Sequence, residues 1–323
     1  MQGSILHRTE QFIENRKRIE RAFRLSTPQT HCLCALLLGL DDVDVDLDTI
    51  RRGKKTLRRS TGLFSAFRGL GMAPAAIKLG ERADGETRIA FAKDNQKKLK
   101  AAGFAPTDYL CPAAFLLAKQ HDRAAIVAAN AFTQYQAMRH AHRTLTGGED
   151  VLFAVLFAMY DLDPDIVTAR ANEALDLLAE RFHRGNFAQM AGFAIAAANG
   201  DAEALSKKTE RLYDAVRETG VKNREILDVP LLAFLAALDV PEEETAQRIA
   251  AVNDYLIAQK GFSAARVGRS QRLFYATALT AIDALFAAEL PDAERAKLRD
   301  LLQTLMLSGI LLFIVAAMSA SKQ

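Results

Sequence analysis

Residues 151–161 read VLFAVLFAMYD, a short apolar block that is closed by an aspartate. Blocks of the same kind recur along the chain, and their end residues, all Asp or Gly, stand at positions 41, 80, 122, 161, 200 and 239. The intervals between these end residues are 39, 42, 39, 39 and 39 residues. Five similar intervals in a row indicate a structural repeat of about 39 residues.

Each interval also contains a second segment with a helical pattern of apolar residues. From Val167 to Phe182, apolar residues follow one another at steps of 4, 3, 4 and 4, which places them on one face of an α-helix. Such segments end near a glycine, for example Gly185, Gly220 or Gly261, as helices commonly do. Each repeat is therefore predicted to be an αα-hairpin of one apolar helix and one amphipathic helix.

The composition points to the same fold class. Half of the residues are apolar and 25% are charged, while Trp is absent and Pro numbers eight, which favours a folded helical chain over a β-rich or disordered one. One hairpin cannot bury its apolar helix alone, so neighbouring hairpins must stack. We predict an all-α protein of stacked αα-hairpin repeats, arranged as a solenoid or a closed α/α ring. The repeats are assigned to residues 1–297, and residues 298–323 to a C-terminal apolar helix that acts as a cap or tail.

Several helix starts are marked locally. Pro164 suits the first position of a helix, because a proline there loses no backbone hydrogen bond, and Pro291 followed by Asp292 marks another start. Thr146, followed three residues later by Glu149, fits a capping box, in which both side chains accept hydrogen bonds from backbone N–H groups that are otherwise free. These signals predict where individual helices begin.

The most apolar stretch is residues 301–320, which contains the run LMLSGILLFIVAAM at 305–318. Its length is near that of a membrane span, yet no Trp or Tyr flanks it, so a buried helix and a tail inserted in a membrane or a partner both remain open. Residues 1–18 lack the apolar core of a signal peptide, and the three cysteines are expected to be reduced. A cytoplasmic protein is therefore expected, with C-terminal membrane association as the alternative.

The strongest charged feature is RRGKKTLRR at residues 51–59. Residues 1–100 hold 20 Lys and Arg against 12 Asp and Glu, so this end of the chain is positive. Basic residues at this spacing could contact several phosphates, although Asp48 upstream and the helix dipole also explain them as a solvated helix end. The candidate anion-binding residues are Arg51, Arg52, Lys54, Lys55, Arg58 and Arg59.

Other patterns lack the residues that a known chemistry requires. An EF-hand that began at Asp42 would place Leu47 where glycine is needed, and Glu180-x-x-His183 has no second copy for a di-iron site. His140 and His142 point in different directions on a helix, and the glycines at 69 and 71 lack a third glycine. We therefore predict no catalytic residue, no metal ligand and no cofactor.

Several short motifs together resemble an uncharacterised bacterial family. They are residues 98–104 (KLKAAGF), Tyr109-Leu110, Ala113-Ala114, residues 64–68 (FSAFR) and residues 145–150 (LTGGED). The chain is similar over about residues 10–320 to domain of unknown function family 4003. That family favours Ser or Thr, then a short gap, then Asp, whereas here two glycines follow Thr146 in the gap before Asp150. The resemblance implies an all-helical bacterial cytoplasmic protein and no particular chemistry.

Three functions follow as hypotheses. The first is a non-enzymatic scaffold that binds a protein partner along the helical stack. The second is an enzyme whose groups meet inside a helical ring, and the third is binding of an anion or nucleic acid through residues 51–59.

Overall fold

A computed structural model describes residues 3–62, 65–68, 72–80, 84–198, 200–221, 225–264 and 266–320. Over these ranges the chain forms fifteen α-helices and three short 3-10 helices, with no β-strand. The all-α prediction is therefore confirmed.

The chain divides into two compact units. One unit consists of Met1–Ile13 and Asp165–Gly309, and the other consists of Glu14–Pro164 and Ile310–Gln323. We refer to them as the C-terminal unit and the N-terminal unit. Helix α1 (Ser4–Ala22) and helix α15 (Asp292–Ala320) each supply residues to both units.

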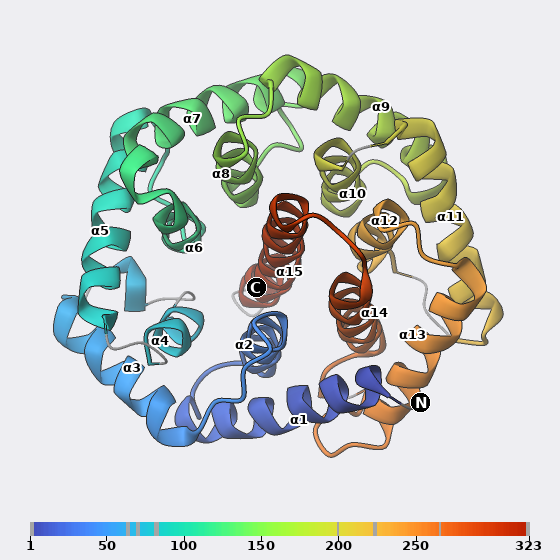
Figure 1. Ribbon diagram of the computed structural model, residues 1–323, viewed down its shortest axis with the longest axis horizontal. Coiled ribbons are helices and arrows are strands. Elements are labelled where there is room, and N and C mark those ends of the chain that lie inside the picture. Colours follow the sequence, from blue (N-terminus) through green and yellow to red (C-terminus); the bar gives the residue numbers. More distant parts are fainter. Residues whose placement is uncertain are drawn as a thin grey trace. The chain divides into compact units, whose positions relative to one another are not determined.

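The N-terminal unit alternates between apolar and amphipathic helices, which lie in two layers (Figure 1). The amphipathic layer contains α3, α5 and α7, each of which packs against the next. The apolar layer contains α2, α4, α6 and α8, with α2 against α4 and α6 against α8. The bounds are α2 (Pro28–Leu40), α3 (Leu47–Ser60), α4 (Met72–Gly80), α5 (Gly85–Ala102), α6 (Leu110–Leu117), α7 (Ala124–Ala141) and α8 (Val151–Met159).

The C-terminal unit follows the same alternation (Figure 1). Amphipathic α11 packs against α13, and apolar α10 packs against α12, which in turn packs against α14. The bounds are α9 (Pro164–Phe182), α10 (Asn186–Ala197), α11 (Ala202–Glu218), α12 (Val229–Ala237), α13 (Glu242–Ile257) and α14 (Arg269–Ala287).

The sequence pattern explains which face of each helix is buried. All nine residues of α8 are buried, as expected for an unbroken apolar run. Helix α9 buries one stripe, which contains the predicted apolar residues, and exposes its opposite face. Pro164 and Asp292 begin α9 and α15 as predicted. The buried residues of α9 are Val167, Ala171, Ala174, Leu175, Leu178 and Phe182.

Small residues allow helices of the C-terminal unit to approach closely. A Cβ atom added at Gly192 on α10 would lie 2.7 Å from the carbonyl oxygen of Ala171 on α9, which is closer than real Cβ contacts.

Three residues that end apolar blocks have positive φ, namely Asp161 (49°), Gly200 (156°) and Asp239 (55°). Each helix thus ends in a backbone conformation that turns the chain sharply.

Helix α15 carries the long apolar stretch, and its residues from Leu298 to Ile314 are largely buried. Within the C-terminal unit, a Cβ atom at Gly309 would lie 3.0 Å from the ring of Phe274, so α15 lies close against α14. Among the described residues, no helix has the length and apolar character needed to cross a membrane. The described side chains up to Ile314 thus behave as a buried helix.

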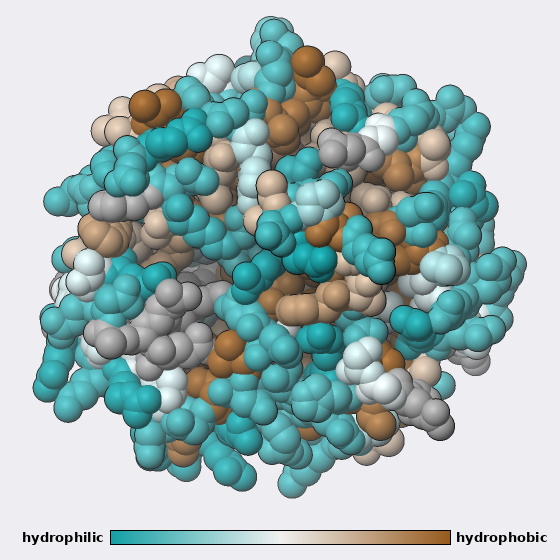
Figure 2. All heavy atoms as spheres, in the orientation of Figure 1, coloured by the Kyte–Doolittle hydropathy of each residue, from teal (hydrophilic) through white to brown (hydrophobic). Residues whose placement is uncertain are grey.

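Hydrophilic residues dominate the face drawn in Figure 2, where hydrophobic residues form separate small patches. Only five large hydrophobic side chains are markedly exposed among the described residues. They are Leu25, Ile126, Ile166, Ile257 and Phe286.

Candidate anion-binding groove

Helix α3 is amphipathic, and its charges follow the helix dipole. The Asp46 side chain accepts a hydrogen bond from the Thr49 N–H at 2.6 Å, which caps the N-terminal end. Ile50 and Leu57 are fully buried on the face that packs against α4 and α5. The basic residues therefore lie on the opposite face, away from the core.

That basic face borders a cavity of about 410 Å³ in the N-terminal unit. Five of the six predicted residues line it, and the end of α1 contributes the other wall through Arg21 and Ala22. Arg52 is not among the lining residues; its Nη2 donates instead to the Thr49 hydroxyl at 2.6 Å. The lining residues from α3 are Arg51, Lys54, Lys55, Arg58 and Arg59.

Lys54 joins the two walls of the groove. Its Nζ donates to the carbonyl oxygen of Ala22 at 2.9 Å and lies 4.7 Å from the centre of the Phe23 ring. Burial, and then the positive charge of Arg58, lower the pKa of Lys54. Both effects disfavour the charged form of Lys54, so holding this cation near Arg58 lowers the stability of the folded protein.

Within the described part of the chain, no carboxylate lines the groove. Arg51 does form an ion pair, with its Nη1 3.2 Å from Asp48 Oδ1, but both side chains are exposed. Among the described residues, Arg21, Lys55, Arg58 and Arg59 form no ion pair through their side chains. The groove therefore presents positive charge that the described chain does not neutralise.

Sequence reasoning missed Arg21, because it lies about 30 residues from α3 in the sequence and a linear pattern does not connect the two. The only available signal was the general excess of basic residues near the start of the chain. In the structure, the hydrogen bond from Lys54 to the Ala22 carbonyl oxygen shows that the end of α1 lies beside α3.

Comparison with known proteins gives one assignment. Residues 15–318 match the profile of a family described as a protein of unknown function, DUF4003. The chain belongs to this family. No curated protein and no solved structure gives a significant match.

Elsewhere in this DUF4003 chain, the LTGGED motif builds a buried helix start rather than the expected capping box. The Thr146 hydroxyl donates to the Met138 carbonyl at 3.1 Å, and Asp150, not Glu149, accepts the Gly147 N–H at 2.8 Å. The prediction of a capping box from Thr146 to Glu149 is therefore wrong by one residue, because the N-cap of the 3-10 helix Gly148–Asp150 is Gly147 and the side chain that accepts its N–H is that of Asp150. Phe64 of the FSAFR motif lies outside the described residues.

Asp150 and Asp228 are buried carboxyl groups at the starts of two apolar helices, α8 and α12. Each is 1% exposed, and Oδ1 of each lacks a hydrogen-bond partner among the described residues. Burial, together with the nearby Glu149, raises the pKa of Asp150 well above its usual value, and burial raises the pKa of Asp228 to about 7. Burial thus makes the charged form of both carboxyl groups less favourable than it is in water.

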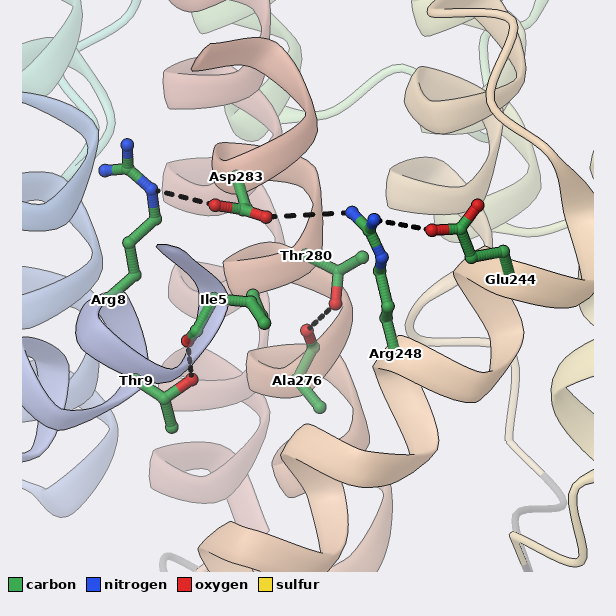
Figure 3. Close-up of polar contacts among 8 residues, drawn as sticks. All are labelled: Ile5, Arg8, Thr9, Glu244, Arg248, Ala276, Thr280 and Asp283. Carbon is green, nitrogen blue, oxygen red and sulfur yellow. Dashed lines mark hydrogen bonds and ion pairs between the residues drawn. The ribbon is translucent and has the colours of Figure 1, made fainter. Parts of the chain in front are cut away.

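A third buried carboxylate, Asp283, is fully matched by cations in the C-terminal unit (Figure 3). Its Oδ1 accepts from Arg8 Nε at 3.2 Å, and its Oδ2 lies 3.8 Å from Nη1 of Arg248. Arg248 also contacts Glu244 at 2.6 Å, and Arg8 lies 4.1 Å from the centre of the Phe286 ring. We call these four charged residues the Asp283 network; its charges balance within the unit, which fits a structural role.

The remaining motifs show no ligand geometry. His183 follows the last residue of α9 with φ of 59°, and His142 is the C-terminal cap of α7. Within the described part of the chain, no three His, Cys, Asp or Glu residues are placed to hold a metal ion. Cys34 and Cys111 are buried, and burial raises the pKa of both thiols, which makes them poor nucleophiles. The glycines at 69 and 71 lie outside the described residues.

Proposed function

We propose that this protein is a non-enzymatic binding protein whose groove between α1 and α3 holds a phosphate-bearing polyanion. The observation that carries the proposal is a cavity of about 410 Å³ with six cationic side chains and no carboxylate in its lining. Structural cations on this chain are commonly matched, as Arg211 is by Glu242 and Lys208 by Asp239. Of the six cations only Arg51 has a carboxylate partner among the described residues, the exposed Asp48, so the cluster is better explained by a ligand than by folding.

The chemistry of the groove favours phosphate over other anions. Three arginines on one face of α3 can each form two parallel hydrogen bonds to phosphate oxygens. Residues three or four apart on a helix have Cβ atoms about 5–6 Å from each other, so the basic side chains form a row of positive charges. Such a row suits a ligand with closely spaced phosphates. No aromatic residue lines the groove, so base stacking is not expected, and recognition would be independent of sequence.

A scaffold role is compatible with this proposal. The alternation of apolar and amphipathic helices in each unit, with positive φ at Asp161, Gly200 and Asp239, supports stacked αα-hairpin repeats of about 39 residues. Such a stack would hold the groove as a rigid platform, and it would offer other outer helices to a protein partner. Deleting residues 162–200, one complete interval, tests the repeat: we expect a helical product that still unfolds cooperatively.

The groove is tested by charge reversal at three exposed lining residues. The triple variant R51E/K55E/R58E should bind labelled inorganic polyphosphate at least about 100-fold more weakly than the parent protein. The parent's affinity should fall steeply as salt rises, and the variant's residual binding should lose most of that dependence. Fluorescence anisotropy at several salt concentrations measures both effects.

A matched control separates a local effect from total charge. The triple variant K100E/R143E/K260E changes the net charge by the same amount at exposed residues outside the groove. This control should bind polyphosphate within about twofold of the parent, with equal helix content by circular dichroism. If both variants lose affinity equally, binding depends on overall charge and the groove proposal is wrong.

Single-stranded RNA of mixed sequence supplies a further comparison. If phosphates alone are recognised, RNA sequences of different base composition should bind with affinities that differ less than about threefold. A marked preference for one base sequence would contradict phosphate recognition, because it requires contacts with base edges.

A further inference from the structure

A second cavity, of about 320 Å³, lies in the C-terminal unit at the N-terminal end of α14. Its size falls at the lower end of the range typical of small-molecule sites. The charges in its wall are mixed, unlike those of the α3 groove. Six of its lining residues concern us here, namely Val221, Asn253, Asp254, Ile257, Arg269 and Arg272.

Arg272 is a buried cation held in a fixed orientation. It is only 7% exposed, although burying a guanidinium is costly unless it is used. Its Nε donates to Asn253 Oδ1 at 3.1 Å and its Nη1 donates to the Phe262 carbonyl oxygen at 3.0 Å. Asn253 is itself 5% exposed, so this support is rigid.

These two hydrogen bonds leave one edge of the guanidinium group unused. Among the described residues, Nη2 of Arg272 donates to no acceptor, and Arg272 forms no ion pair. Because the side chain lines the cavity, the free edge is available to a ligand there. A planar guanidinium that is already oriented is well suited to a carboxylate, which it can bind through two parallel hydrogen bonds.

Arg269 adds a second positive charge one turn earlier on α14. It is exposed and forms no ion pair within the described part of the chain. The N-terminal end of α14 has no side-chain cap, since Gly268 occupies the capping position. The helix dipole therefore adds to the attraction for a negative group at this end of the cavity.

Asp254 supplies the opposite charge on α13. Its carboxylate lines the same cavity, yet it forms no ion pair with either arginine among the described residues. A ligand with both a negative and a positive group could therefore contact the arginines and Asp254 at the same time. Val221 and the half-exposed Ile257 line the cavity as well, and they add apolar surface to its wall.

We propose that this cavity binds a free α-amino acid with an aliphatic side chain. The ligand carboxylate would bind Arg272 and Arg269, its ammonium group would bind Asp254, and its side chain would lie against Val221 and Ile257. This site is independent of the α3 groove, since each lies in a different unit.

Isothermal titration of the full-length protein with L-leucine tests the site. We expect saturable binding at millimolar or lower concentrations. N-acetyl-L-leucine, which lacks the ammonium charge, and L-leucinamide, which lacks the carboxylate, should each bind at least about tenfold more weakly. No heat of binding from leucine, or equal affinity for leucine and N-acetyl-leucine, would overturn the proposal, as would tighter binding of inorganic phosphate.

Two exposed residues supply variants that should fold normally. Asp254→Asn should weaken leucine binding about tenfold and should remove the preference for leucine over N-acetyl-leucine, because the ammonium contact is gone. Arg269→Gln should weaken both ligands together, since both carry the carboxylate. Lys260→Gln, exposed and outside the cavity, should bind leucine like the parent. Unchanged binding in Asp254→Asn or in Arg269→Gln would contradict the assignment.

Discussion

The α3 groove and the Asp283 network hold similar charged groups in opposite arrangements. In the groove, six cations from α1 and α3 line a cavity that contains no carboxylate. In the network, a carboxylate that is 5% exposed lies between the guanidinium groups of Arg8 and Arg248. Charges that balance within a unit serve the fold, whereas charges that remain unbalanced at a cavity reduce stability and suit a ligand.

Asp228 provides the sharpest test of this rule, since it is a buried carboxyl group that forms no ion pair among the described residues, although the charge of Arg217 acts on it. Its pKa is about 7 in the folded protein, against an ordinary value of 3.8. The folded state therefore favours the protonated form, so its stability is greatest at acidic pH and falls as pH rises from about 4 to 7.

Asp228→Asn should remove this loss, because the amide cannot ionise. The difference in free energy of unfolding between variant and parent should be small near pH 4 and should reach on the order of 4 kcal/mol in favour of the variant near pH 8. Urea denaturation at the two pH values measures it, with exposed Asp239→Asn as the control. A difference that does not change with pH would show that Asp228 is ionised in the folded protein.

Removing the central carboxylate of the Asp283 network should have the next largest effect. Asp283→Ala removes the buried carboxylate that faces the largely buried Arg8 and should lower the free energy of unfolding by about 3 kcal/mol. Glu244→Ala removes only the exposed partner of Arg248 and should cost less than about 1 kcal/mol. Thermal unfolding followed by circular dichroism compares the two. Equal losses would mean that burial of the carboxylate is not what matters.

The groove should respond in the opposite direction. Arg58 lies four residues from Lys54, and its positive charge helps to lower the pKa of Lys54. Because Arg58→Gln removes this repulsion, the free energy of unfolding should rise by up to about 0.5 kcal/mol at low salt. The same change should weaken polyphosphate binding several-fold. Adding salt should abolish the gain in stability, because screening removes the repulsion. A loss of stability at low salt would place Arg58 among the structural charges.

The smallest effect is expected at a matched but exposed pair. Arg211 Nε lies 3.0 Å from Glu242 Oε1, and the arginine side chain is 59% exposed. Arg211→Gln should change the free energy of unfolding by less than about 0.5 kcal/mol, because solvent screens the pair. It should leave polyphosphate binding unaltered. A larger loss of stability would mean that this pair is coupled to neighbouring charges.

The helices and their buried faces can be predicted from the order of the residues along the chain. The unbroken apolar run of α8 and the stripe from Val167 to Phe182 on α9 follow from side-chain periodicity, which is a local property of the chain. Five of the groove residues were also visible, since their spacing on one helix face depends only on helical geometry.

The groups that those side chains face depend on how the chain folds in space. Arg21 joins the groove across about 30 residues of sequence, and the cavity at α14 combines residues from α13, α14 and the segment after α11. The cap of the 3-10 helix Gly148–Asp150 likewise depends on a contact outside the motif, because the Thr146 hydroxyl donates to the carbonyl oxygen of Met138 on α7. Hydrogen bonds and charge pairs act over a few ångströms in space, so distances along the chain do not predict them.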